Sequence, residues 1–158
     1  AKSNGRLKNA IMKLESKRNI DLIVVHCADT YARMDIGAKE INEWHLSRGW
    51  SGCGYHFIIK LDGTIEVGRD IEKIGAHCKG YNRNSIGICY AGGRGDDDKP
   101  KDTRTDSQKI TMSALIISLQ ASNPNAEVKG HNELSNKACP SYDVQKDMQS
   151  LSDYLFML

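Results

Sequence analysis

The sequence has no apolar run long enough to cross a bilayer and no apolar segment of the kind that a secretory signal peptide requires. It also contains no internal repeat, and its net charge of +2 at pH 7 is too balanced to indicate binding to nucleic acid. We therefore expect a single domain of 158 residues with its own hydrophobic core, made in a cytoplasm and without a nucleic-acid partner.

The five cysteines are an odd number, and without a sign of secretion this favours thiols that stay reduced. No C-x-x-C pair and no H-E-x-x-H motif is present, so the local spacings that most often mark zinc sites are missing. Cys53, Cys78 and Cys89 are expected to be small thiols in or near the core. A metal site in this chain must therefore combine residues that are far apart in the sequence.

Positive charge is concentrated at the start of the chain. Residues 1–20 carry six Lys or Arg residues against Glu15, a net charge of +5, so the rest of the chain has a net charge of −3. Apolar residues at helical spacing predict a short amphipathic helix over residues 7–18. We expect residues 1–20 to form a basic N-terminal arm or helix ahead of a catalytic domain over residues 21–158.

Hydrophobic patterning predicts strands and helices that alternate along the chain. The continuous apolar run Leu22–Val25 is typical of a strand buried on both faces. Further along, the pattern predicts a helix over 37–47 with Ile41, Trp44 and His45 inward, a hairpin of 55–60 and 65–67, a strand over 85–90, a helix over 107–121, a strand over 128–130 and a packed C-terminal helix from 141 or 143. This interleaving predicts an α/β fold, a single domain in which a mixed central β-sheet is covered by two or three helices.

Three metal-binding side chains lie at or after predicted strands near the two ends of the chain. His26 closes the first strand, His131 follows the last one, and Cys139 lies in the loop beyond it. Two imidazoles and one thiolate are typical zinc ligands, and a catalytic zinc site usually leaves a fourth position to water. These residues predict a zinc hydrolase, whereas His45 and His56 are expected to be structural.

Eight short motifs extend this hypothesis, and they are His26–Ala28, Glu40–His45, Gly54–Lys60, Asp62–Thr64, Gly68–Asp70, Asn84–Gly87, Gly130–His131 and Lys137–Pro140. Over about residues 20–150 the chain thereby resembles the zinc-dependent N-acetylmuramoyl-L-alanine amidases. Within that family it is most similar to the phage enzymes of the T-seven type, which are called lysozymes. Those enzymes share a fold with peptidoglycan-recognition proteins, so the resemblance implies that fold here.

The resemblance also implies a role for each matching residue. His26, His131 and Cys139 would hold one Zn²⁺ per chain, with Tyr55 and Lys137 as the catalytic pair beside it. The bond cut would be the amide between N-acetylmuramic acid and L-alanine in peptidoglycan, which makes the chain an endolysin that lyses its host. Lys137 would stabilise the oxyanion, and Tyr55 would orient or deprotonate the water or bond the tetrahedral intermediate. No paired carboxylates of the glycosidase kind are recognisable.

We expect His77 and Asn84 to contact the muramyl peptide, because the loop and strand that carry them face the same end of the sheet. For Asn84, a brace within the loop over 80–85 is an equal alternative.

Several alternatives stay open. Cytoplasmic amidases that recycle wall fragments resemble this family but carry a glutamate where Tyr55 stands, and recognition proteins that bind without cutting lack the thiolate that Cys139 supplies. Some phage relatives also inhibit their phage's RNA polymerase, which leaves open a polymerase partner, and residues 1–20 leave open an anionic cell-envelope surface. Without a signal peptide, we expect the protein in the host cytoplasm until another protein releases it to the cell wall.

Overall fold

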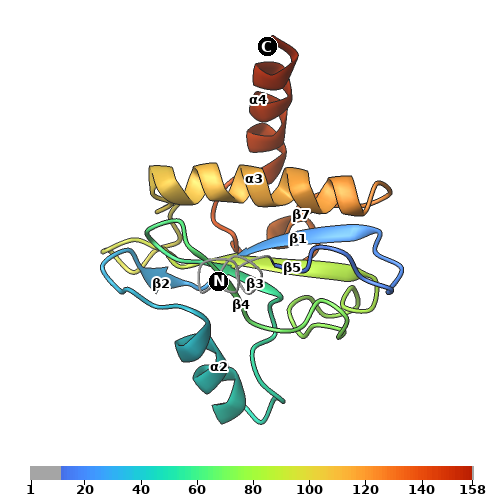
Figure 1. Cartoon of the computed structure of the whole chain (residues 1–158). Helices are drawn as coiled ribbons and strands as arrows, with labels where there is room; N and C mark the ends of the chain where they lie inside the picture. The colour runs from blue at the N-terminus through green and yellow to red at the C-terminus, as the bar shows by residue number, and fades with distance from the viewer. Residues whose placement is uncertain (1–11, 158) are drawn as a thin grey trace, which may run out of the picture.

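The computed structural model describes residues 12–157 (Figure 1). Within that range, a five-stranded sheet has the order β4-β3-β5-β1-β7, and two short strands form a separate parallel pair. The strands are β1 (Leu22–Cys27), β2 (Thr30–Tyr31), β3 (Phe57–Ile59), β4 (Ile65–Val67), β5 (Ser85–Tyr90), β6 (Gly93–Arg94) and β7 (Glu127–Gly130). The helices are α2 (Ala38–Ser47), α3 (Asp106–Ser122), the 3₁₀ helix η1 (His131–Glu133) and α4 (Val144–Met157).

The sheet is mixed, because β1 runs parallel to β5 and β7, β3 runs parallel to β5, and only the edge strand β4 is antiparallel to its neighbour β3. Gly63, with a φ of 86°, forms the turn between β3 and β4, as the Asp-Gly signal predicts. Parallel strands end at one common edge, and ligands of such sheets bind outside their carboxyl ends. The residues that follow β1 and β7 therefore meet at that edge.

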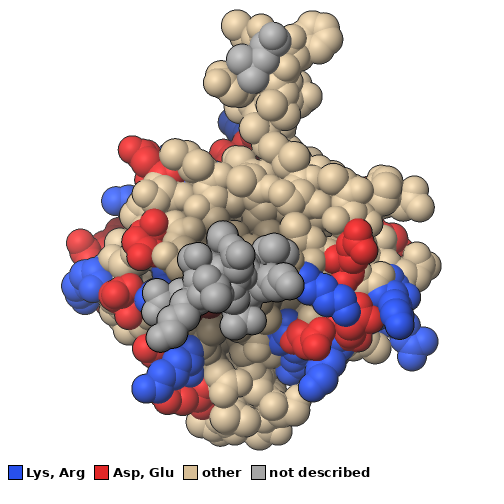
Figure 2. All heavy atoms as spheres, in the orientation of Figure 1, with Lys and Arg blue, Asp and Glu red and all other residues tan. Residues whose placement is uncertain are grey.

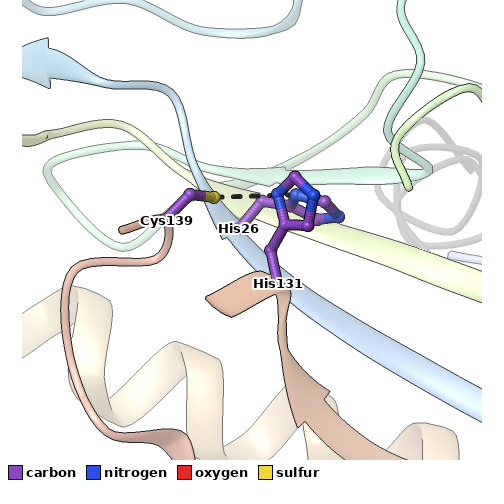
Figure 3. Close-up of side chains that lie close together, drawn as sticks. All are labelled: His26, His131 and Cys139. Carbon is purple, nitrogen blue, oxygen red and sulfur yellow. Dashed lines mark hydrogen bonds between the residues drawn. The ribbon is translucent and has the colours of Figure 1, made fainter. Parts of the chain in front are cut away.

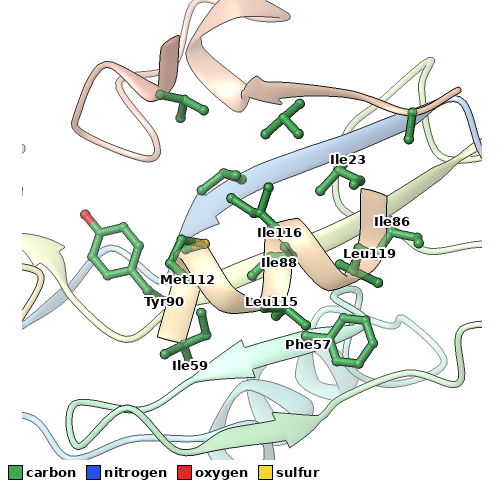
Figure 4. Close-up of a cluster of buried hydrophobic side chains, with 14 of the residues drawn as sticks. Ile23, Phe57, Ile59, Ile86, Ile88, Tyr90, Met112, Leu115, Ile116 and Leu119 are labelled. Atoms are coloured by element: carbon green, nitrogen blue, oxygen red, sulfur yellow. The ribbon is translucent and has the colours of Figure 1, made fainter. Parts of the chain in front are cut away.

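Helix α3 covers one face of the sheet, where the main core lies (Figure 4). The helix begins with a capping box in which Thr105 and Gln108 each bond the other's backbone. Beneath it, β1 and β5 are buried along almost their whole length, as strands in the interior of a sheet covered on both faces are. The core residues that Figure 4 labels are Ile23, Phe57, Ile59, Ile86, Ile88, Tyr90, Met112, Leu115, Ile116 and Leu119.

Helix α2 lies on the other side of the sheet (Figure 1), where Ile36 and Ile41 pack with Ile58 and Cys89. The prediction that Trp44 faces inward is wrong, because its side chain is 37% exposed. Periodicity gives the phase of a helix but not the width of the surface that its neighbours cover. The fold class predicted from sequence is confirmed, and β5 has the predicted bounds.

The N-terminal segment lies along the body without forming the expected helix. Residues 12–18 are not helical, and residues 7–11 of the predicted helix lie outside the described residues. The Arg18 guanidinium donates to the carbonyl oxygens of Ile71, Arg83 and Ser85 at 2.9, 3.1 and 3.0 Å. This side chain therefore ties both ends of the loop between β4 and β5 to the start of the chain.

Helix α4 stands away from the body of the protein (Figure 1). Val144 at its start is buried, but Phe156 and Met157 near its end are 93% and 84% exposed. The prediction that the whole helix packs is wrong, because the helix leaves the body after its first turns. Figure 2 shows mainly uncharged side chains on its outer part, and charges of both signs on the body below it. None of the helices described between residues 12 and 157 is long and apolar enough to cross a membrane.

Candidate metal centre and active site

The three predicted ligands meet at the carboxyl edge of the sheet because of strand register. Val25 of β1 pairs with Gly130 of β7, so His26 and His131 follow neighbouring positions on adjacent parallel strands. Their rings lie 4.6 Å apart between centroids. Cys139 reaches them from the loop after η1, and its sulfur accepts a hydrogen bond from the Cys27 backbone N–H at 3.2 Å.

The geometry of the cluster fits a single ion (Figure 3). The ligand atoms of His26, His131 and Cys139 all lie within 4.8 Å of one another, and Cys139 Sγ is 3.7 Å from His26 Nδ1. Nitrogen and sulfur ligands of a tetrahedral zinc are roughly 3.6 Å apart when the bonds have their usual lengths. The described residues thus contain a cluster of two histidines and one cysteine that could hold a metal ion.

The environment keeps the two imidazoles neutral, which is the state that binds a metal. Burial lowers the pKa of His26 well below its ordinary value, and the neighbouring His77 lowers it further. Burial and the charge of Lys137 lower the pKa of His131. A hydrogen bond with Cys27, together with burial, raises the pKa of the Cys139 thiol, so a cation is needed to hold this residue as a thiolate.

His26 and His77 form a hydrogen-bonded pair at the base of the cluster. His77 Nδ1 lies 2.9 Å from His26 Nε2, and His77 Nε2 lies 3.0 Å from Ser85 Oγ. Burial lowers the pKa of His77 to about 3, so this imidazole is neutral as well. The pair leaves Nδ1 of His26 facing Cys139.

An open groove passes over the cluster. It consists of two adjoining hollows of about 520 and 420 Å³, a size typical of ligand sites, and both are lined by Arg48, Tyr55, His131 and Lys137. The predicted catalytic pair therefore lines this groove together with two of the predicted ligands, His131 and Cys139, while the buried His26 lies against His131. Arg48 has no motif to mark it in the sequence, and it reaches the groove from the position directly after the end of α2.

Tyr55 reaches the cluster because β3 is shorter than the predicted strand. The strand begins at Phe57, so the pleat does not fix the side chain of Tyr55. Its ring lies 5.0 Å from the ring of His26 and 5.6 Å from that of His45, and burial raises the pKa of its phenol. His45 is a hydrogen-bonded histidine, as expected, since its Nδ1 accepts the Gly54 N–H at 2.8 Å.

Of the two residues predicted to contact substrate, His77 borders the groove and Asn84 does not. His77 borders the groove but is only 8% exposed, and both of its ring nitrogens bond within the protein. Asn84 immediately precedes β5, at the opposite end of that strand from the cluster, and its carbonyl accepts the Asp21 N–H at 3.0 Å. Among residues 12–157, those lining the groove include Asn82 and not Asn84.

Comparison with known families decides what this arrangement represents. The sequence profile of the N-acetylmuramoyl-L-alanine amidases matches residues 16–142, which include the cluster, Tyr55 and Lys137. The chain belongs to the N-acetylmuramoyl-L-alanine amidase family. The resemblance drawn from the eight motifs is thereby confirmed, and so is the assignment of the chain as an amidase.

Individual relatives agree with this assignment. The endolysin of Escherichia phage T7 is 42% identical over 137 residues, which cover 87% of this chain and 91% of that protein. The endolysine N-acetylmuramoyl-L-alanine amidase LysCS from Clostridium intestinale URNW superposes with a TM-score of 0.73 at 30% identity over 85% of each chain. A complex of peptidoglycan recognition proteins LCa and LCx with tracheal cytotoxin bound superposes with a TM-score of 0.62 at 26% identity, over 83% of this chain and 81% of that one.

Proposed function

We propose that this amidase is a phage endolysin, which hydrolyses the amide bond between N-acetylmuramic acid and L-alanine in bacterial peptidoglycan and so lyses the host cell. The observation that carries the proposal is the convergence of His26, His131 and Cys139 at a groove that is lined by Tyr55 and Lys137. Similarity to a phage endolysin over most of both chains supports the lytic role. The recognition-protein relative with tracheal cytotoxin bound supports a muramyl peptide as the ligand of this groove.

We assign one Zn²⁺ per chain to His26, His131 and Cys139. When bound, this ion supplies the Lewis acidity that activates water and polarises a scissile carbonyl. The protein's part is to keep both imidazoles neutral, to offer the cysteine as a thiolate, and to leave one side of the cluster open to the groove. The donor set and the spacing of 3.7 Å between Cys139 Sγ and His26 Nδ1 are those that zinc requires.

Lys137 and Tyr55 act on the reacting groups of the substrate. The ammonium group of Lys137 would stabilise the developing oxyanion, a contribution of about 3 kcal/mol if it resembles other oxyanion donors. Cleavage also requires a proton on the leaving amine. Among the described residues, the carboxylate that lines the groove is Asp29, and it is paired with Arg94 at 2.7 Å. We therefore assign the relay of that proton to the phenol of Tyr55.

Two residues argue against the alternatives left open by the sequence. Tyr55 occupies the position where recycling amidases carry a glutamate, and Cys139 supplies the thiolate that non-cutting recognition proteins lack. The polymerase partner and the anionic surface stay open alternatives, since residues 1–11 lie outside the described part of the chain. The roles of His77 and Asn84 as contacts of the muramyl peptide stay predictions, and so does the domain boundary after residue 20.

Digestion of purified peptidoglycan tests the proposal. The zinc-loaded protein should release free amino groups of L-alanine without producing new reducing ends of sugars, and the Cys139→Ser variant should release neither. New reducing ends would indicate a glycosidase. Binding to peptidoglycan with no release of either group would show a recognition module in place of an enzyme.

A further inference from the structure

We propose that His77 is a positioning residue, which holds His26 in the one tautomer and ring orientation that presents Nδ1 to the metal. The inference rests on the proposed zinc site, and it assigns a role to a residue that lies behind the ligands. It differs from the substrate contact expected for His77 from sequence.

The hydrogen bonds of His26 leave a single arrangement that permits metal binding through Nδ1. This atom faces Cys139 Sγ at 3.7 Å (Figure 3). Nε2 of the same ring lies 2.9 Å from His77 Nδ1. A neutral imidazole carries one proton, so a metal on Nδ1 requires the proton on Nε2. Nε2–H of His26 then donates to Nδ1 of His77, and Nε2–H of His77 donates to Ser85 Oγ at 3.0 Å.

The opposite direction of these hydrogen bonds is incompatible with a metal on Nδ1 of His26. If Ser85 donated to His77 Nε2, the ring of His77 would carry its proton on Nδ1 and would donate it to His26. His26 would then have its own proton on Nδ1, the atom that faces Cys139. An acceptor at Nδ1 of His77 is therefore what makes Nδ1 of His26 available as a ligand.

His77 is itself held too firmly to serve as an adaptable substrate contact. The backbone N–H groups of His77 and Cys78 both donate to Asn82 Oδ1 at 2.9 Å, which fixes the loop on either side of the ring. The ring lies directly over Gly87 of β5, where a Cβ atom would come within 2.6 Å of His77 Cγ. The glycine thus provides the space that the ring occupies, and no ring nitrogen is left to bind a ligand in the groove.

A buried partner of this kind fixes the orientation of a metal-bound histidine and raises its basicity, and loss of such a partner typically lowers metal affinity by about 10- to 100-fold. We expect that loss when the acceptor at position 77 is removed. A side chain that restores an acceptor close to Nδ1 should recover most of the affinity.

The test measures the zinc dissociation constant by competition with a chelator, for the full chain and for four variants. His77→Phe fills the space without an acceptor, and His77→Asn keeps an amide oxygen near the position of Nδ1. Ser85→Ala removes only the outer hydrogen bond, and Tyr81→Phe is a control on an exposed side chain of the same loop. The thermal midpoint of each metal-free variant, and the visible spectrum of each variant with Co²⁺ in place of zinc, are recorded in parallel.

We expect His77→Phe to weaken zinc binding by about 10- to 100-fold and to shift the Co²⁺ spectrum. His77→Asn should stay within a few-fold of the unmodified protein, Ser85→Ala should lie between the two, and Tyr81→Phe should match the unmodified protein. Unchanged zinc affinity in both His77→Phe and Ser85→Ala would overturn the inference, and a raised KM in His77→Phe would then favour a substrate contact. Failure of the proposed function is distinguishable, because in that case the unmodified chain itself would not bind one zinc.

Discussion

Cys139 Sγ lies 3.7 Å from His26 Nδ1, although 113 positions separate the two residues in the chain. His26 is the penultimate residue of β1, an interior strand of the sheet, whereas Cys139 lies in the loop that follows η1. Most of the sheet must therefore form before the two side chains meet. A metal ion bound by both would link the C-terminal part of the chain to the centre of the sheet.

Zinc should therefore stabilise the folded protein. A ligand that binds only the native state adds about 4 kcal/mol when its concentration is a thousand times its dissociation constant. Treatment with a chelator should lower the thermal unfolding midpoint, and added zinc should restore it. The Cys139→Ser variant should not respond to either, while Cys53→Ser, which alters a buried thiol outside the cluster, should respond as the unmodified protein does.

Replacement of Tyr55 by phenylalanine should lower kcat by about 10²- to 10⁴-fold without loss of the metal. The phenol supplies a hydrogen bond and a proton path to the reacting groups, and such groups contribute about 10²- to 10⁴-fold to the rate. The measurements are kcat on peptidoglycan and zinc content per chain. Tyr81→Phe alters a tyrosine that is 43% exposed and should keep full activity. A Tyr55→Phe variant with normal kcat would remove this residue from the reaction.

Replacement of Lys137 by methionine keeps most of the side chain's length but removes its charge. Loss of an oxyanion donor costs about 3 kcal/mol, so kcat should fall by roughly 100-fold. Lys109→Met, on the exposed side of α3, is the matched control and should leave kcat unchanged. If the change at Lys137 raised KM and left kcat intact, the residue would bind substrate without acting on the transition state.

Loss of the Arg18 side chain should destabilise the whole domain. Its guanidinium donates to three backbone carbonyls at the two ends of the loop between β4 and β5, and one of them belongs to the buried Ser85. Hydrogen bonds from charged groups are worth more than neutral ones, so Arg18→Ala should lower the free energy of unfolding by on the order of 3 kcal/mol. Arg83→Ala, which alters an exposed side chain nearby, should change it little. Urea denaturation measures the free energy of unfolding of both variants, and an equal loss in the two would refute the anchoring role of Arg18.

The metal-free protein should lose stability in mild acid because of His56. Burial lowers the pKa of this residue to about 4, so the folded state keeps it neutral while the unfolded chain takes up a proton near its ordinary pKa of 6.5. The stabilising effect is complete above pH 6.5 and is lost as the pH falls through 4, an effect of roughly 3 kcal/mol.

The His56→Gln variant should show a shallower fall in the free energy of unfolding between pH 6.5 and 4 than the unmodified chain. His45 and His77, whose pKa values are also lowered, leave the variant with part of the dependence. Urea denaturation in the presence of a chelator at several pH values gives both curves. Parallel curves would show that His56 does not titrate during unfolding.

Much of the fold could be predicted from local pattern, because β1 contains the continuous apolar run Leu22–Val25, which is typical of a strand buried on both faces. The meeting of His26 with His131 also follows from sequence once two parallel strands are expected to end at one edge. The free outer part of α4 could not be predicted, since an apolar stripe such as Met148 and Leu155 shows which face is apolar but not whether anything covers it.

The inner part of the site was harder to predict. His77 and Asn82 lie in a polar loop without periodicity, and nothing in that loop distinguishes Asn82, which borders the groove, from Asn84, which does not. The hydrogen bond between His26 and His77 spans 51 positions and depends on the space above Gly87. Such contacts arise from tertiary packing, so short-range patterns do not carry them.

Titration of the metal-free protein with zinc, followed by the release of L-alanine amino groups from peptidoglycan, tests the central claim most directly. We predict no release before zinc is added, and a rise in proportion to bound metal that ends at one equivalent per chain. Full release by protein shown to contain no metal, or none after one zinc is bound to the cluster, would contradict a zinc amidase built on His26, His131 and Cys139.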